Sequence, residues 1–251
     1  MATFFAVLVV SVPGAVAAPL HSPLELAQRV ERSAAQTNFD ALETFGRAAL
    51  GRADREGLNR LYHVAWIFLN QGDFGRARYW NEQLSHAARS QADQRYVMIA
   101  RLNDLAIRSD GGEAEVAGQM DALRRQATDW FVAAHATRLV ALNMMGEDRI
   151  GEALNLLTYV QAQVPDDAPY ADTALAGLWE VAGIGLMKLN DFAGASSAFG
   201  RFELDYSRED YPRPDFDSLY NLTRLAVQVG DYELAEDLYQ SHHRLTLRSG
   251  L

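Results

Sequence analysis

The chain has 251 residues, 49% of them hydrophobic, so it can bury a substantial core and is too apolar for a disordered protein. Its 33 acidic and 23 basic residues give a formal net charge of −10, which repels nucleic-acid phosphates and anionic membrane surfaces. The sequence has no cysteine, which excludes disulfides, thiol nucleophiles and Cys-ligated zinc. We therefore expect a folded protein whose partner is neither nucleic acid nor a membrane surface.

The N-terminal segment is uncharged and mostly apolar from residue 2 to residue 18, and it ends in Ala15-Val16-Ala17, the small-x-small pattern that signal peptidases recognise. This pattern predicts a signal peptide over residues 1–17 and a mature domain over 18–251, in the periplasm or secreted. Because the segment begins without Lys or Arg, two alternatives stay open: an uncleaved membrane anchor, or an apolar helix packed on the first repeat. No later segment has the roughly 18 consecutive apolar residues that a membrane span needs.

A short sequence motif recurs along the chain, in which Gly or Asn is followed by Asp, an aromatic residue and, three residues later, Ala. Its copies are Gly72-Asp73-Phe74 with Ala77, Asn190-Asp191-Phe192 with Ala195, and Gly230-Asp231-Tyr232 with Ala235. Gly and Asn tolerate the left-handed backbone that ends a helix, and Asp caps the helix that follows. With looser copies at Phe39 and Ile150, the intervals are 35, 76, 42 and 40 residues, a period that predicts stacked helical hairpins.

One unit carries a more specific pattern, Trp179-x-x-Ala182-Gly183 followed by Ala195-x-x-x-Phe199. In this pattern the chain resembles the tetratricopeptide repeat family, although Ala182 stands where the family usually has Leu. The resemblance extends over most of the chain, clearly in three units and weakly in the first and third. It implies an all-α fold, a right-handed α-solenoid of about six antiparallel helix hairpins.

No arrangement of reactive residues indicates catalysis. His242 and His243 are adjacent, so a helix points them about 100° apart and they cannot chelate one metal. Three more histidines are expected on helix surfaces: His63, His86 and His135. There is no Gly-rich phosphate loop, nucleophile elbow or dinucleotide fingerprint. We expect no enzyme activity, no metal and no cofactor, with a hydrolase or lyase on a helical scaffold as the alternative.

The family resemblance implies that the first helix of each pair lines a concave groove. The side chains that would project into it are Asn59, Tyr62, Trp66, Asn70, His135, Arg138, Leu142, Glu180, Ile184, Lys188, Tyr220, Arg224 and Gln228. Aromatic, amide and cationic groups of this kind suit an extended peptide, although each residue could instead pack between repeats. We expect Tyr62, Trp66, Arg138 and Arg224 to contribute most, because aromatic residues and Arg are enriched at binding hot spots.

The predicted function is a non-enzymatic exported scaffold or adaptor that binds a protein or peptide in this groove. The alternative is a periplasmic sensory region, because helical repeats that follow a signal sequence resemble those of bacterial signalling proteins such as diguanylate cyclases. Homo-oligomerisation stays open.

Overall fold

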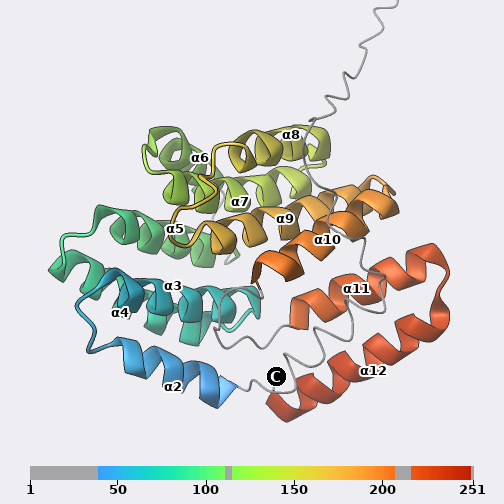
Figure 1. The fold of residues 1–251 in the computed structure, drawn as a ribbon, viewed down its shortest axis with the longest axis horizontal. Helices are drawn as coiled ribbons and strands as arrows, with labels where there is room; N and C mark the ends of the chain where they lie inside the picture. Colours follow the sequence, from blue (N-terminus) through green and yellow to red (C-terminus); the bar gives the residue numbers. More distant parts are fainter. Residues whose placement is uncertain (1–38, 111–114, 207–215, 250–251) are drawn as a thin grey trace, which may run out of the picture.

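The computed structural model describes residues 39–110, 115–206 and 216–249, and these residues form eleven helices and no strand (Figure 1). The predicted all-α class is confirmed. The predicted signal peptide lies outside the described residues. Within the described ranges, no helix combines the length and the apolar character needed to cross a membrane.

The helices follow each other with short connections over most of the chain. In order they are α2 (Phe39–Ala49), α3 (Arg55–Asn70), α4 (Phe74–Ser90), α5 (Gln94–Asp110), α6 (Val116–Gln126), α7 (Trp130–Gly146), α8 (Ile150–Gln161), α9 (Ala171–Lys188), α10 (Phe192–Tyr206), α11 (Phe216–Val229) and α12 (Tyr232–Ser249). Consecutive helices pack in pairs, α3 on α4, α7 on α8, α9 on α10 and α11 on α12. Figure 1 shows these pairs following one another round a curve from α2 to α12.

The predicted helix corners are confirmed. The residue before each Asp has a positive φ, with values of 70° at Gly72, 61° at Asn190 and 81° at Gly230. The Asp side chains then accept hydrogen bonds from the backbone N–H three residues on, at 3.0 Å for Asp73, 2.9 Å for Asp191 and 3.1 Å for Asp231. Four helices begin at the expected residue, namely Phe74, Ile150, Phe192 and Tyr232.

A further corner, between α4 and α5, has no counterpart in the sequence analysis. Its left-handed residue is Ala92, with φ of 54°, and Asp93 accepts a hydrogen bond from the Arg95 N–H at 3.1 Å. Alanine in this conformation costs about 1 kcal/mol, because its Cβ crowds the following carbonyl. An alanine in the sequence therefore does not indicate a turn, whereas Gly or Asn does.

Small residues bring α9 and α10 into close contact. A Cβ added to Gly183 would lie 2.6 Å from the ring of Phe199, and Ala195 is fully buried. Trp179 is only half-buried, and the Arg201 guanidinium lies 4.5 Å from its ring centroid. Trp179 therefore covers the edge of this contact, while Phe199 fills its centre.

The interior divides into three apolar clusters along the chain. The first joins α2 to α7, the second α7 to α10, and the third α9 to α12. Each cluster shares a helix with the next, so the core is continuous but extended, as expected for helices added pair by pair.

Candidate functional site

The thirteen residues predicted to line a groove differ in how deeply they are buried. Six are buried, namely Asn59, Tyr62, Trp66, His135, Arg138 and Glu180. Asn70 and Ile184 are half-buried, and the exposed residues are Leu142, Lys188, Tyr220, Arg224 and Gln228. For the six buried residues this distribution favours the alternative of packing between helices. Five of them contact another member of the set, and Asn59 accepts a hydrogen bond from the Tyr96 hydroxyl at 3.2 Å.

His135 lies at the centre of a buried hydrogen-bond chain. Asn103 uses its amide N–H to donate to Asn81 at 3.1 Å, so its oxygen must accept from His135 Nε2 at 2.8 Å. The other ring nitrogen, Nδ1, then accepts from the Tyr62 hydroxyl at 3.2 Å. Asn81 completes the chain by donating to the carbonyl of Ala100 at 2.8 Å. These partners fix His135 as the neutral Nε2–H tautomer.

Burial, with a smaller effect from the charge of Arg138, lowers the pKa of His135 to about 3. The expected surface position of His135 and His63 is therefore wrong, because both are buried. His86 is exposed, as expected.

Arg138 connects three helices through a second buried set of contacts. Its guanidinium carbon lies 3.8 Å from the Trp66 ring centroid on α3, and its Nη2 pairs with the carboxylate of Glu180 on α9. With its amide oxygen facing them, Asn70 accepts hydrogen bonds from Arg138 at 3.3 Å and from Trp66 Nε1 at 3.0 Å. The Trp66 ring also meets His135 edge-on, with centroids 5.0 Å apart, so the two sets are continuous.

This buried network fixes the relative positions of α3, α7 and α9. Replacing a buried ion pair by apolar residues is often neutral or stabilising, whereas removing one partner is strongly destabilising. The network therefore specifies one arrangement of these helices, although Nε of Arg138 is buried without a hydrogen-bond partner among the described residues.

Tyr220 and Arg224, two exposed members of the predicted set, lie on α11 near aromatic residues of α12. The Tyr220 ring lies 6.5 Å from the ring of His242 and carries Arg224 5.7 Å from its centroid, while Tyr239 stacks on His243 at 6.2 Å. Tyr220 and Tyr239 are each 53% exposed. We call these five residues the aromatic cluster.

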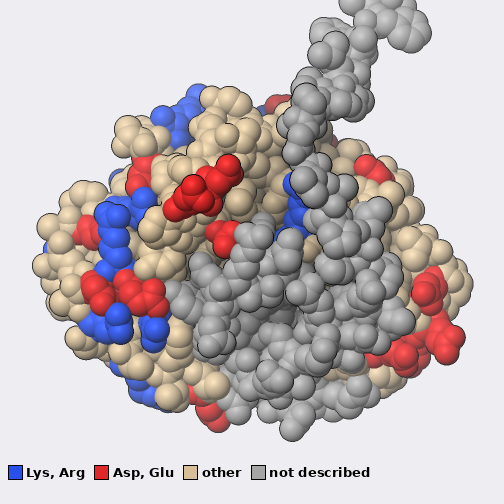
Figure 2. Space-filling model, viewed as in Figure 1, with Lys and Arg blue, Asp and Glu red and all other residues tan. Residues whose placement is uncertain are grey.

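The surface beside the aromatic cluster is acidic. Residues 231–240 include Asp231, Glu233, Glu236 and Asp237, all exposed, and no basic residue. Figure 2 shows Asp and Glu side chains gathered where α11 turns into α12. Because exposed like charges create a local potential, this surface attracts cationic groups.

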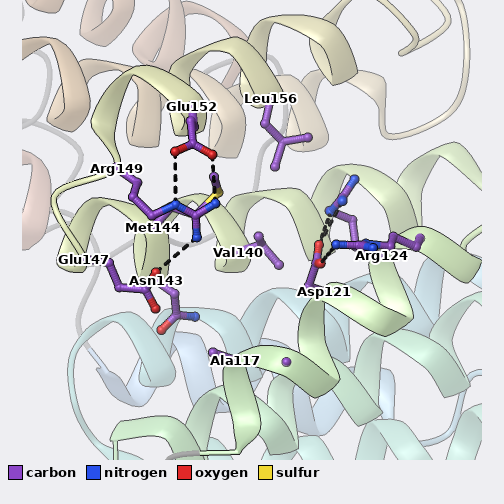
Figure 3. A pocket seen from close by; sticks show the side chains of 12 residues that line it. Ala117, Asp121, Arg124, Val140, Asn143, Met144, Glu147, Arg149, Glu152 and Leu156 are labelled. Carbon is purple, nitrogen blue, oxygen red and sulfur yellow. Dashed lines mark hydrogen bonds and ion pairs between the residues drawn. The ribbon is translucent and has the colours of Figure 1, made fainter.

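A cleft of about 400 Å³ lies between α6, α7 and α8 (Figure 3). Val140, Met144 and Leu156 supply its apolar surface, and six charged side chains border it. Sequence analysis missed this cleft, because its residues come from three helices and match no motif.

Among the described residues, no three His, Cys, Asp or Glu side chains come together in a way that would hold a metal ion. Comparison of the chain with protein-family models, curated proteins and solved structures gives no match.

Proposed function

We propose that this chain is a non-enzymatic scaffold or adaptor of the tetratricopeptide-like kind, which binds a protein or peptide. The packing order supports a solenoid of helix hairpins, which we propose to be right-handed and to have about six hairpins. Successive first helices pack on one another, α3 on α5, α5 on α7 and α7 on α9, and second helices pack on the next first helix, α4 on α5 and α8 on α9. Stacked hairpins bury their apolar faces in this way.

The proposed export to the periplasm or beyond rests on the pattern of residues 1–17.

The aromatic cluster is the observation that supports a binding role. Tyr and Arg are enriched at binding hot spots. Tyr offers a large contact area with only two side-chain torsions to order, and Arg offers several hydrogen-bond donors on a planar group. Tyr220 and Arg224 belong to the predicted groove set, whereas Tyr239 and His243 come from the paired helix. We therefore place the binding surface on α11 and α12, away from the buried network.

The acidic residues of α12 define the chemistry of the proposed partner. A segment that carries Lys or Arg together with apolar side chains would match both the four exposed carboxylates and the tyrosines. Rim charges of this kind mainly raise the association rate, so binding should weaken as salt is added.

Site-specific photo-crosslinking in cells tests the surface. A benzophenone amino acid replaces Tyr220 or Tyr239 in turn, and Tyr159 on α8, 67% exposed, is the matched control. We expect one discrete crosslinked product from both cluster positions and none from Tyr159. Equal labelling from all three positions would contradict the assigned surface.

The partner identified in this way is then purified for affinity measurements. Tyr220→Ala and Arg224→Ala should each weaken binding by about 2 kcal/mol, or roughly thirtyfold, if they are hot spots. Circular dichroism confirms that each variant is folded. Unchanged affinity in both folded variants would remove the aromatic cluster from the proposed interface.

A further inference from the structure

The cleft between α6, α7 and α8 has two charged walls of opposite sign. Figure 3 shows the Asp121–Arg124 pair on one side, the group of Glu147, Arg149 and Glu152 on the other, and Val140 between them. We call the first side the basic wall and the second the acidic wall.

The basic wall has an excess of positive charge. Asp121 pairs with Arg124 at 2.8 Å and with Arg125 at 2.6 Å, so one carboxylate serves two guanidinium groups. Partial burial opposes ionisation of Asp121, but hydrogen bonds from both arginines outweigh it and hold the pKa of Asp121 below its usual value. The side chain of Arg125 is 72% exposed, which leaves N–H groups for an anionic ligand.

The acidic wall has the opposite imbalance. Arg149 donates two hydrogen bonds to Glu152, at 3.2 Å and 2.8 Å, and a third to Glu147 at 3.2 Å. One guanidinium thus serves two carboxylates, and the hydrogen bond from Arg149 lowers the pKa of Glu152. Both glutamates are exposed, and each ionised carboxylate has further lone pairs to accept hydrogen bonds from a cation.

Apolar side chains line part of the cleft, and a glycine leaves space on its α6 side. The apolar residues are Val140, Met144 and Leu156, and the glycine is Gly118, which borders the cleft without a side chain. A Cβ added at Gly118 would meet no atom within 4 Å. The space is therefore open to a ligand, and its volume falls within the range of small-molecule sites.

We propose that this cleft binds a short zwitterionic peptide, a di- or tripeptide with free termini and an apolar side chain. Its carboxylate would lie against Arg124 and Arg125, its ammonium group against Glu147 and Glu152, and its side chain over Met144. An extended tripeptide is about 10 Å long, so its two terminal charges lie at opposite ends and could contact different walls. Lone anions or cations satisfy one wall only, so the site favours molecules that carry both charges.

Titration of the purified protein with Ala-Leu-Ala, followed by calorimetry and by NMR of the labelled protein, tests the proposal. We expect saturable binding that shifts the resonances of Gly118 and Asn143. Acetylation of the amino terminus and amidation of the carboxyl terminus should each weaken binding about tenfold or more, since each removes a charge-assisted hydrogen bond. Absence of saturable binding, or equal binding of the doubly blocked peptide, would overturn the proposal.

Paired variants test the orientation. In the Arg124→Gln/Arg125→Gln protein, amidation of the peptide should lose its effect while acetylation keeps it, and Glu147→Gln/Glu152→Gln should show the reverse. The two proteins are checked for folding by circular dichroism. If acetylation and amidation of the peptide had the same effect in both double variants, the proposed orientation would be contradicted.

A steric variant tests the location of the site. Gly118→Leu fills the cleft and should abolish binding, whereas Gly200→Leu on α10, where an added Cβ also meets no atom within 4 Å, is the matched control and should bind like the natural protein. Both changes replace a helical glycine, so neither should destabilise the fold through backbone propensity. Full binding by Gly118→Leu would exclude this cleft as the site.

Discussion

Arg138 carries a buried charge that the carboxylate of Glu180 compensates. It is buried between the Trp66 ring and the Glu180 carboxylate, and Glu180 is buried too. Arg138→Met or Glu180→Leu alone should destabilise the protein by about 3–5 kcal/mol, because each leaves an uncompensated buried charge. The double variant should recover most of that loss, since apolar residues replace both charges.

Urea unfolding followed by circular dichroism measures this cycle. The coupling between the two positions is the difference between the double variant and the sum of the single variants. Additive losses, with the double variant the least stable of the four proteins, would mean that the pair does not act as a unit.

His135 should make the stability depend on pH. In the unfolded chain its pKa is near 6.5, whereas burial lowers the pKa in the folded protein to about 3. Between these values the unfolded state binds the extra proton, so stability is full above pH 6.5 and falls as the pH decreases. At pH 5 the titration of this histidine should lower the free energy of unfolding by about 2 kcal/mol, relative to its value above pH 6.5.

The measurement compares unfolding free energies at pH 7.5 and pH 5.0 in the natural protein and in His135→Gln. Carboxylates titrate in both proteins, so the difference between their pH dependences isolates the histidine. His86→Gln, which changes an exposed histidine, is the control and should keep the natural pH dependence. An identical pH dependence in His135→Gln would show that His135 is not buried as a neutral ring.

Sequence analysis identified several residues of the buried network but not their environment. Tyr62, Trp66, His135 and Arg138 were selected by their positions in the repeat, and the structure does bring them together. Their burial could not be predicted, because it depends on how α3, α7 and α9 pack across about 120 residues of sequence. Asn103 was missed because a polar residue between apolar neighbours is normally expected at the border of a helix's apolar face. Only its hydrogen-bond partners in the structure show that it is buried.

At the scale of helices, the corners were the most predictable feature. Gly72, Asn190 and Gly230 give a local signal, because few other residues adopt a positive φ readily, and the Asp that follows each one caps the next helix. Ala92 does the same with no local signal, so the start of α5 needed the structure. The cleft of α6, α7 and α8 was equally unpredictable, because it depends on contacts between helices.

The contact between α9 and α10 gives a prediction at this scale. Gly183→Ala should destabilise the protein by about 1–3 kcal/mol, because the new methyl group would lie 2.6 Å from the Phe199 ring. Gly200→Ala, on the open side of α10, should instead stabilise it by about 0.5–1 kcal/mol through helix propensity.

Thermal unfolding of the two single variants, and of Gly183→Ala combined with Phe199→Leu, separates these effects. The smaller side chain at position 199 should remove the clash, so the combined variant should lose less than Gly183→Ala and Phe199→Leu together. Equal melting temperatures for Gly183→Ala and Gly200→Ala would show that the two helices are not in close contact.

For the molecule as a whole, the sequence predicted an all-helical chain through its period, and the described residues agree. The period indicates that units repeat, but the curvature depends on small rotations between neighbours that no single residue encodes. The predicted groove set divides into a buried part on α3, α7 and α9 and an exposed part that includes Tyr220, Arg224 and Gln228 on α11.

An extended core should also unfold unevenly. The α11–α12 pair belongs to an apolar cluster joined to the rest through α9 and α10, whereas α3 to α7 share a larger cluster and the buried polar network. In such a chain, opening of one pair disrupts only its own contacts and those with its neighbour, so its free energy is smaller than that of global unfolding. We expect hydrogen exchange, followed by mass spectrometry under native conditions, to be faster in peptides from α11 and α12 than in peptides from α3 and α7. Addition of a partner that binds the aromatic cluster should slow exchange in α11 and α12 selectively, because it stabilises only the closed form of that pair. Uniform protection across all these helices, lost in one step with denaturant, would contradict the expected uneven stability.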